Sequence, residues 1–205
     1  MTPTISYAIT ACNEHEELNR LLTKLCDYKS EKDEIIIQLD TNASDEVKMI
    51  VFGFKNHIET LIEFPLNKDF ATFKNNIKNF CKKDYIIYID ADEYLNEDII
   101  EYLPMILEMN PEVDLYYIPR WNTVEGLTKE HISKWGWNLD DQSRINWPDL
   151  QGRICKNVPE IQWIGKVHER LVGYKGVSRL PDQFYLIHPK TIERQEKQNK
   201  LYDTI

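Results

Sequence analysis

Two aspartates separated by one residue follow a strongly apolar segment of the chain. Residues 85–89 (YIIYI) are typical of a buried strand, and Asp90 and Asp92 come directly after them. In an extended chain, residues two apart point to the same side, so the two carboxylates project together. They follow the carboxyl end of the strand, which is where open α/β sheets bind ligands. The two like charges would repel unless a divalent cation lay between them and a ligand, and Mg²⁺ or Mn²⁺ there could neutralise a diphosphate.

The acidic segment after residue 89 can also be explained without a ligand. The position of a further aspartate helps to decide between the two explanations. The acidic loop could merely cap the following helix, and Glu93 is expected to face solvent or a loop partner. Asp40, however, follows another apolar run, residues 34–39, and could accept a hydrogen bond from a base N–H or a ribose hydroxyl. Two neighbouring strand ends therefore carry acids, which favours a ligand site.

The composition narrows the classes of function. The 205 residues include 25 basic and 34 acidic side chains, and the net charge of −9 disfavours a protein that coats phosphate backbones. Among seven glycines the first is Gly53, so the N-terminal region contains neither a G-x-G-x-x-G motif nor a P-loop. We therefore exclude Rossmann dinucleotide-binding proteins and P-loop NTPases.

The cysteines and the length of the apolar runs predict the cellular compartment of the protein. The four cysteines form no C-x-x-C pair, which favours reduced thiols over a zinc site or a disulfide framework. No apolar run approaches the roughly 20 residues of a membrane span, and the N-terminus lacks a signal-peptide pattern. We expect a cytoplasmic, intracellular protein without a transmembrane segment, which could still lie peripherally at a membrane surface.

The spacing of apolar residues predicts alternating strands and helices up to residue 119. Strands are expected over 4–11, 34–39, 57–64, 85–89 and 113–119, and helices over 14–28, 44–52, 69–81 and 97–109. This alternation predicts an α/β fold with a mostly parallel central sheet flanked by helices. Residues 120–150 show no long periodic element. Short strands are expected near 152–156, 161–164 and 183–187, and a polar helix over 191–202.

Six segments together resemble a known family. They are TISYAITACNEHEEL (4–18), DTNASD (40–45), FATFKNNIKNFCKKDYIIYIDADEYL (70–95), INWPDLQGRICKN (145–157), WIGKVHERL (163–171) and IHPKTIERQEKQNKLY (187–202). The first three are similar to the opening strand, the D-S-G-S-T-D turn and the F-A-x-x-[RK]-N helix with the D-x-D strand of family 2 glycosyltransferases, which have the GT-A fold. The last three resemble a subgroup that includes lipopolysaccharide-core glucosyltransferases. The resemblance runs in order from about residue 4 to residue 202.

This resemblance implies a single domain over 1–205 and a site for a nucleotide-diphosphate sugar, with uridine as the family's commonest base. The nucleotide-sugar-binding half would span about 1–119, and a loop-rich acceptor or catalytic half about 120–205. Carried over by position, four residues would lie around the nucleotide: Thr10, Asn13, Asp40 and Lys74. Asp92 would bind Mn²⁺ or Mg²⁺, Asp90 would contact the ribose or a metal-bound water, and His188 would approach the metal or the diphosphate.

Transfer with inversion, which the family resemblance also implies, needs a carboxylate that takes the proton of the acceptor hydroxyl. The candidates are Glu169 and Asp149, with a slight preference for Glu169. Each could instead form an ion pair, Asp149 with Arg153 and Glu169 with Arg170 or Lys166. The tryptophans between residues 121 and 147 could stack on acceptor sugars or simply pack this half together.

Two other functions remain as alternatives to the glycosyltransferase. A sugar-phosphate nucleotidyltransferase would need a glycine-rich N-terminal loop with a basic residue, and residues 1–16 contain neither glycine nor lysine. A module or subunit that binds a sugar nucleotide without turnover is not excluded by any spacing. The acceptor could be a glycan, a lipid-linked sugar, a protein side chain or a modified nucleobase, and an oligomer or partner chain could complete its site.

Overall fold

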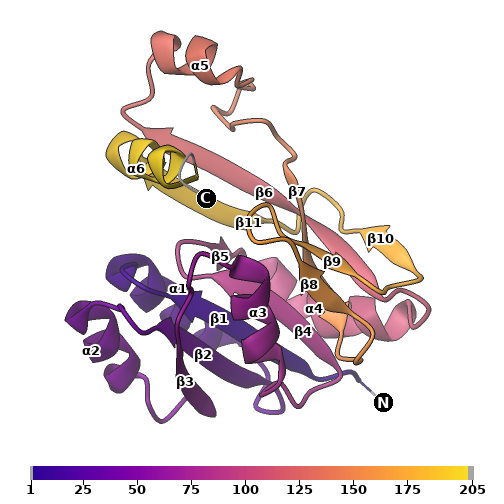
Figure 1. Cartoon of the computed structure of the whole chain (residues 1–205). Coiled ribbons are helices and arrows are strands. Elements are labelled where there is room, and N and C mark those ends of the chain that lie inside the picture. Colours follow the sequence, from indigo (N-terminus) through magenta and orange to yellow (C-terminus); the bar gives the residue numbers. More distant parts are fainter. Residues whose placement is uncertain (1, 203–205) are drawn as a thin grey trace.

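The computed structural model describes residues 2–202, and its centre is one twisted sheet with helices against it (Figure 1). The strands are β1 (Ile5–Ala11), β2 (Glu34–Asp40), β3 (Thr60–Phe64), β4 (Tyr85–Asp90), β5 (Tyr94–Leu95), β6 (Leu115–Glu125), β7 (Leu150–Lys156), β8 (Gln162–Ile164), β9 (Arg170–Val172), β10 (Val177–Arg179) and β11 (Leu186–Thr191). The helices are α1 (His15–Tyr28), α2 (Asp45–Gly53), α3 (Phe70–Lys78), α4 (Glu97–Met109), α5 (Lys129–Trp135) and α6 (Ile192–Tyr202).

The first half of the sheet is parallel, as the sequence predicts. Strands follow the order β3-β2-β1-β4, and β1 pairs in parallel with both β2 and β4. The strands β1 and β2 are buried almost throughout, which is the usual state of a parallel strand covered on both faces. Helix α1 contributes the fully buried stripe Leu18, Leu21, Leu22 and Leu25. Each such leucine stabilises the fold by about 1.5–3 kcal/mol relative to exposure.

The second half departs from this pattern. Strand β7 is antiparallel to both β4 and β6, whereas β11 runs parallel to β6 and antiparallel to β5. The sheet therefore continues from the first half into the second without a break in pairing, in the order β4-β7-β6-β11-β5. This mixed arrangement brings the carboxyl end of β4 beside β7 and β6, where side chains from both halves meet.

Several elements of the second half differ from the predictions, and the short strands β9 and β10 were not expected at all. The strand expected to end at residue 119 continues to Glu125, because residues 120–125 pair with β11. Polar side chains such as Asn122 and Thr123 gave this part no strand periodicity. A short helix, α5, also lies within residues 120–150, where no long element was expected. Its first turn is closed by a capping box between Thr128 and His131, and Figure 1 shows it projecting from the body of the molecule.

In the described part of the chain, no helix combines the length and apolarity that crossing a bilayer requires.

The carboxylate of Asp114 links the residue just before β6 to two later segments of the chain. Asp114 accepts hydrogen bonds from Lys156 Nζ at 2.8 Å and from the backbone N–H groups of Lys175 and Gly176 at 2.8 and 3.1 Å. These bonds lower the pKa of Asp114 to about 2. The backbone comes so close here that a Cβ on residue 176 would lie 2.2 Å from the carbonyl oxygen of Glu112, so glycine is required.

The substitution Asp114→Asn is therefore expected to lower the free energy of unfolding by about 1–2 kcal/mol at pH 7. A carboxylate whose pKa is lower in the folded than in the unfolded state stabilises the fold above the unfolded value, near 3.9, and loses this effect as the pH falls towards the folded value. The difference in free energy of unfolding between the original protein and Asp114→Asn, measured by urea titration, should thus roughly halve between pH 7 and pH 3. Asp141→Asn, at an exposed position, is the control. A difference that stays constant down to pH 3 would contradict the argument.

Candidate active site

A cavity of about 580 Å³ opens where β4, β6, β7 and β11 meet, between these strands, the β8–β9 hairpin and α6. Five of the residues singled out in the sequence line it: Asp90, Asp92, Asp149, Glu169 and His188. Lys74 is not part of the lining but forms an ion pair with Glu169. Thr10, Asn13 and Asp40 lie at the ends of β1 and β2 and are not part of this lining.

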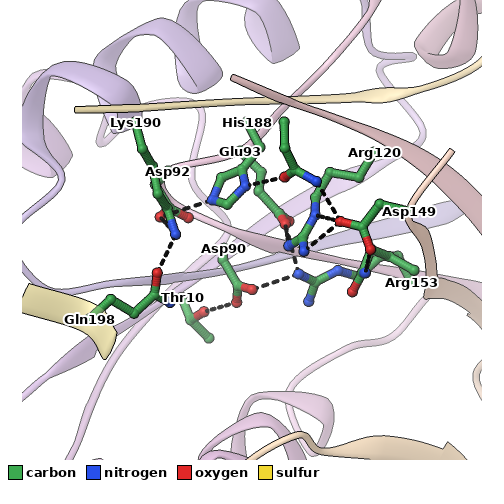
Figure 2. A network of polar contacts seen from close by, with 12 residues as sticks. Thr10, Asp90, Asp92, Glu93, Arg120, Asp149, Arg153, His188, Lys190 and Gln198 are labelled. Carbon is green, nitrogen blue, oxygen red and sulfur yellow. Dashed lines mark hydrogen bonds and ion pairs between the residues drawn. The ribbon is translucent and has the colours of Figure 1, made fainter. Parts of the chain in front are cut away.

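Asp90 is surrounded by cationic groups of the protein itself. Its carboxylate lies 2.7 Å from Arg153 Nη2 and accepts a hydrogen bond from Thr10 Oγ1 at 3.1 Å (Figure 2). It also lies 3.2 Å from Lys74 Nζ. Burial opposes ionisation, but Arg153 and Lys74 outweigh it and hold the pKa of Asp90 well below its usual range. The repulsion expected between two neighbouring carboxylates is thus relieved at Asp90 by protein cations.

Asp92 faces the C-terminal part of the chain. Its Oδ2 lies 3.3 Å from His188 Nε2 and 3.7 Å from Lys190 Nζ (Figure 2). Burial again opposes ionisation, yet His188 and Lys190 keep the pKa of Asp92 below its ordinary value. The other imidazole nitrogen, Nδ1, lies 2.6 Å from Asn122 Oδ1. The Asn122 amide is oriented by its donation to Asp149, so Nδ1 carries the proton.

This arrangement decides how well Asp92 and His188 suit a divalent cation. With the proton on Nδ1, Nε2 presents a lone pair beside the Asp92 carboxylate, so both groups can act as metal ligands. An imidazole oriented through its other nitrogen is the usual form of a metal-binding histidine. No group of three potential ligands occurs among residues 2–202. The pair therefore fits Mg²⁺ or Mn²⁺ that takes its other ligands from phosphate and water.

A network of buried and half-buried ion pairs adjoins Asp90 and centres on Glu93. Glu93 is 1% exposed, and its Oε1 lies 2.9 Å from Arg120 Nη1 and 2.8 Å from Arg153 Nη2. Arg120 also contacts Asp149, at 2.8 Å. The prediction that Glu93 faces solvent or a loop partner is wrong, because its side chain is buried between Arg120 of β6 and Arg153 of β7. Asp149 pairs with Arg120 and not with Arg153.

Sequence reasoning missed Arg120, which links the two halves of this network. The one available signal was its position directly after the apolar start of a strand, where an arginine is costly unless it is paired. Burial acts to lower the pKa of Arg120, but neighbouring Glu93 and Asp149 outweigh it and raise the pKa above its ordinary value, so the guanidinium stays charged. Within the described structure, Arg153 Nε and Glu93 Oε2 have no hydrogen-bond partner, which leaves two buried polar atoms beside the cavity.

Glu169 is held from the first half of the chain. Its Oε1 accepts a hydrogen bond from Lys74 Nζ at 2.7 Å, and neither Arg170 nor Lys166 pairs with it among the described ion pairs. Lys74 is buried and also lies 4.9 Å from the ring centroid of Trp163. Glu169 is thereby fixed at one oxygen, while its side chain borders the cavity.

The remaining predicted nucleotide residues organise the ends of β1 and β2. Asp40 is buried, and its two oxygens accept hydrogen bonds from the backbone N–H groups of Asn42 and Leu66, at 2.7 and 2.9 Å. Asn13 is exposed in the turn after β1, and its backbone N–H donates to Glu14. Asp40 thus ties together the loops that follow β2 and β3, and Asn13 leaves its side chain to solvent.

Comparisons with known proteins identify similar sequences and structures. A family model described as glycosyl transferase family 2 matches residues 6–163. Two curated relatives are poly-β-1,6-N-acetyl-D-glucosamine synthases of Staphylococcus epidermidis, each 26% identical over 110 residues. The match covers 53% of this chain and 26% of each relative, so it spans about a quarter of their length.

Solved structures of S. aureus TarS have a similar fold. TarS 1–349 superposes with a TM-score of 0.66 at 12% identity, and its complex with UDP-GlcNAc with 0.67 at 14%. The complex with UDP gives 0.63 at 15%. Each match covers 91% of this chain and 58–60% of the TarS chain. The predicted α/β architecture of the GT-A type is thereby confirmed.

Proposed function

The chain belongs to glycosyl transferase family 2, and from this premise we propose that it transfers a sugar from a nucleotide-diphosphate sugar to an acceptor hydroxyl, with inversion at the anomeric carbon. The observation that carries the proposal is the Asp92–His188 pair at the edge of the cavity, with Asp90 beside it. Uridine diphosphate is the proposed leaving group, supported by the bound UDP and UDP-GlcNAc of the TarS structures. Membership of the lipopolysaccharide-core subgroup stays a prediction.

Asp92 and His188 would hold Mn²⁺ or Mg²⁺, which when bound supplies positive charge to the leaving diphosphate. Asp90, already balanced by Arg153 and Lys74, remains beside this pair as the proposed contact of the ribose or of a water. Lys190, 3.7 Å from Asp92, adds a second cation on the same side. Thr10, Asn13, Asp40 and Lys74 stay the proposed surroundings of the nucleotide.

Glu169 is our candidate for the base. Among the described residues only Lys74 pairs with its carboxylate, through Oε1, so Oε2 is available to the acceptor. The acceptor O–H proton would pass to Oε2 while the oxygen forms its bond to the anomeric carbon. The bond from that carbon to the diphosphate oxygen breaks, and its electron pair leaves with the diphosphate.

Asp149 is the weaker candidate because its oxygens are already occupied. They accept hydrogen bonds from Arg120 at 2.9 Å, Asn122 at 2.5 Å and Gln151 at 2.9 Å. Burial opposes ionisation, but these donors and the charge of Arg120 lower the pKa of Asp149, which makes it a poorer proton acceptor. We assign it the role of orienting Arg120 and Asn122.

Calorimetric titration with UDP, GDP, CDP and ADP, each with and without Mn²⁺, tests the proposal. We expect UDP to bind at least tenfold more tightly with Mn²⁺ than without it, since the cation would join the diphosphate to Asp92. ADP is the control for nonspecific binding of a nucleotide diphosphate. If no nucleotide binds under either condition, the chain does not hold a donor site and the proposal is wrong.

A further inference from the structure

The outer face of helix α4 carries a line of exposed apolar side chains. They are Tyr102, Met105 and Met109, which are 42%, 51% and 73% exposed. Because residues three and four apart lie on the same side of a helix, the three form one continuous apolar stripe. A surface helix normally turns polar side chains to solvent, and single exposed apolar residues are common, but a row of three indicates a contact surface.

Helix α4 lies beside α1 on the face of the sheet opposite α3 (Figure 1). Its other side supplies the buried residues Ile99, Ile100, Leu103 and Leu107 to the core, so the helix is fixed in place and the stripe cannot turn inward. No residue of α4 lines the cavity of the candidate active site. The stripe is therefore a surface separate from the proposed donor site.

Carboxylates border the stripe on α4 itself. Asp98 lies one turn before Tyr102, and Glu101 and Glu108 lie one turn to either side of Met105. Asp98 and Glu101 are exposed and form no ion pair within residues 2–202. The helix contains no lysine or arginine, so no side chain of its last turn compensates the negative end of the helix dipole.

The cations of neighbouring segments do not neutralise these acids. Lys24 of α1 pairs with Glu97, Lys156 of β7 with Asp114 and Arg179 of β10 with Asp182. Lys175, in the loop before β10, lies beyond the end of α4, where its backbone N–H donates to Asp114. The stripe therefore combines apolar contact area with a negative border.

Helix α2 provides a comparison, because it also exposes apolar side chains. Met49 is 73% exposed, as Met109 is, and Phe52 is exposed as well. Lys48 follows Val47 beside Met49, and the Lys55 ammonium lies 4.4 Å from the centroid of the Phe52 ring. The surface of α2 thus has cations of its own, whereas that of α4 has none.

The negative border decides which occupant suits the stripe. A second copy of the chain placed face to face would bring carboxylate against carboxylate, and an anionic lipid surface would be repelled in the same way. A helix with an apolar face flanked by lysines or arginines would instead place positive charge against Asp98, Glu101 and Glu108. Methionine side chains adapt their shape to such a partner because they are unbranched and flexible.

We propose that the exposed face of α4 is a docking surface for a basic amphipathic helix of a partner protein. Tyr102, Met105 and Met109 receive its apolar side chains, and the bordering acids pair with its cations. From Asp98 to Met109 the surface extends over about 16 Å, which corresponds to three turns of a partner helix. Burial of the two methionine side chains supplies affinity, and the charges select a basic partner over an acidic one.

Methyl NMR of the protein labelled with ¹³C-methyl methionine tests the proposal. The chain contains four methionines, of which Met105 and Met109 lie on the stripe and Met49 on α2. The probe is a synthetic helix of leucine and lysine, about 18 residues long, titrated at about 0.15 M salt. We expect the signals of Met105 and Met109 to shift until one peptide is bound per chain, while the signal of Met49 stays in place.

Two further peptides and three variants sharpen the test. A peptide of the same composition without an apolar face, and one with glutamate in place of lysine, should each bind at least tenfold more weakly. The double variant Met105→Ser/Met109→Ser should weaken binding of the basic peptide at least tenfold, measured by fluorescence anisotropy. Asp98→Asn/Glu101→Gln should weaken it less and make it less sensitive to salt. Met49→Ser is the matched control and should leave the affinity within about twofold.

Several results would overturn the proposal. An equal shift of Met49 would show nonspecific binding, and no shift of Met105 and Met109 would show that the stripe does not bind the helix. Shifts that grow with protein concentration alone would assign the surface to a second copy. Larger shifts with vesicles of phosphatidylglycerol than with the peptide would assign it to a membrane. Failure of UDP to bind would remove the proposed function and leave this docking surface unaffected.

Discussion

The substitution Glu169→Gln is expected to lower the turnover number by a factor of about 10²–10⁴, the usual contribution of a positioned general base. Glutamine has nearly the same shape, and its amide oxygen can still accept the hydrogen bond from Lys74, which spans 2.7 Å in the structure. It cannot accept a proton from the acceptor hydroxyl at neutral pH. Affinity for the nucleotide diphosphate should therefore stay within about twofold of the original protein.

Release of the nucleotide from the donor, measured per folded enzyme, checks this expectation. Glu160→Gln is the control for loss of one carboxylate, because Glu160 is exposed on the loop before β8. Asp149→Asn is the informative comparison: an amide NH₂ group opposite Arg120 and Asn122 should lower the free energy of unfolding by about 1–3 kcal/mol, with less loss of turnover than Glu169→Gln. If Glu169→Gln turned over normally and Asp149→Asn did not, the two roles would have to be exchanged.

For Asp92→Asn we expect the affinity of UDP in the presence of Mn²⁺ to fall at least tenfold, to the level measured without the cation. Loss of a residue that merely orients a metal ligand already costs about 10–100-fold in metal affinity, and Asp92 is proposed as a ligand itself. Asparagine retains one oxygen but lacks the negative charge that now faces His188 at 3.3 Å. The affinity for UDP measured without Mn²⁺ should change little. The variant is therefore expected to lose only the part of the UDP affinity that Mn²⁺ contributes.

Calorimetry on both proteins, with and without Mn²⁺, measures this difference directly. Asp98→Asn is the matched control, since Asp98 is an exposed carboxylate in the first turn of α4. The assignment of Asp92 would be refuted by an equal enhancement of UDP binding by Mn²⁺ in the variant and the original protein. In that case the metal ligands would have to be sought elsewhere in the chain.

Much of the fold was predictable because its information is local. The apolar runs of β1, β2 and β4 and the leucine stripe of α1 are visible within windows of a few residues, and the structure confirms them with only small shifts of their ends. The strand expected over 57–64 begins at Thr60, and the one expected over 183–187 begins at Leu186. The extension of β6 to Glu125 was not predictable, because it depends on pairing with β11 more than sixty residues later.

The sequence by itself determined the parallel half of the sheet and the place of Asp90 at the end of a buried strand, since an apolar run can be recognised without any distant contact. The tertiary structure alone decided which charges meet. It brings His188 to Asp92 across 96 residues and Lys74 to Glu169 across 95, and it buries Glu93 between Arg120 and Arg153. The physical reason is that an ionised group is stabilised by the opposite charge nearest in space, and that distance is set by the packing of the whole chain.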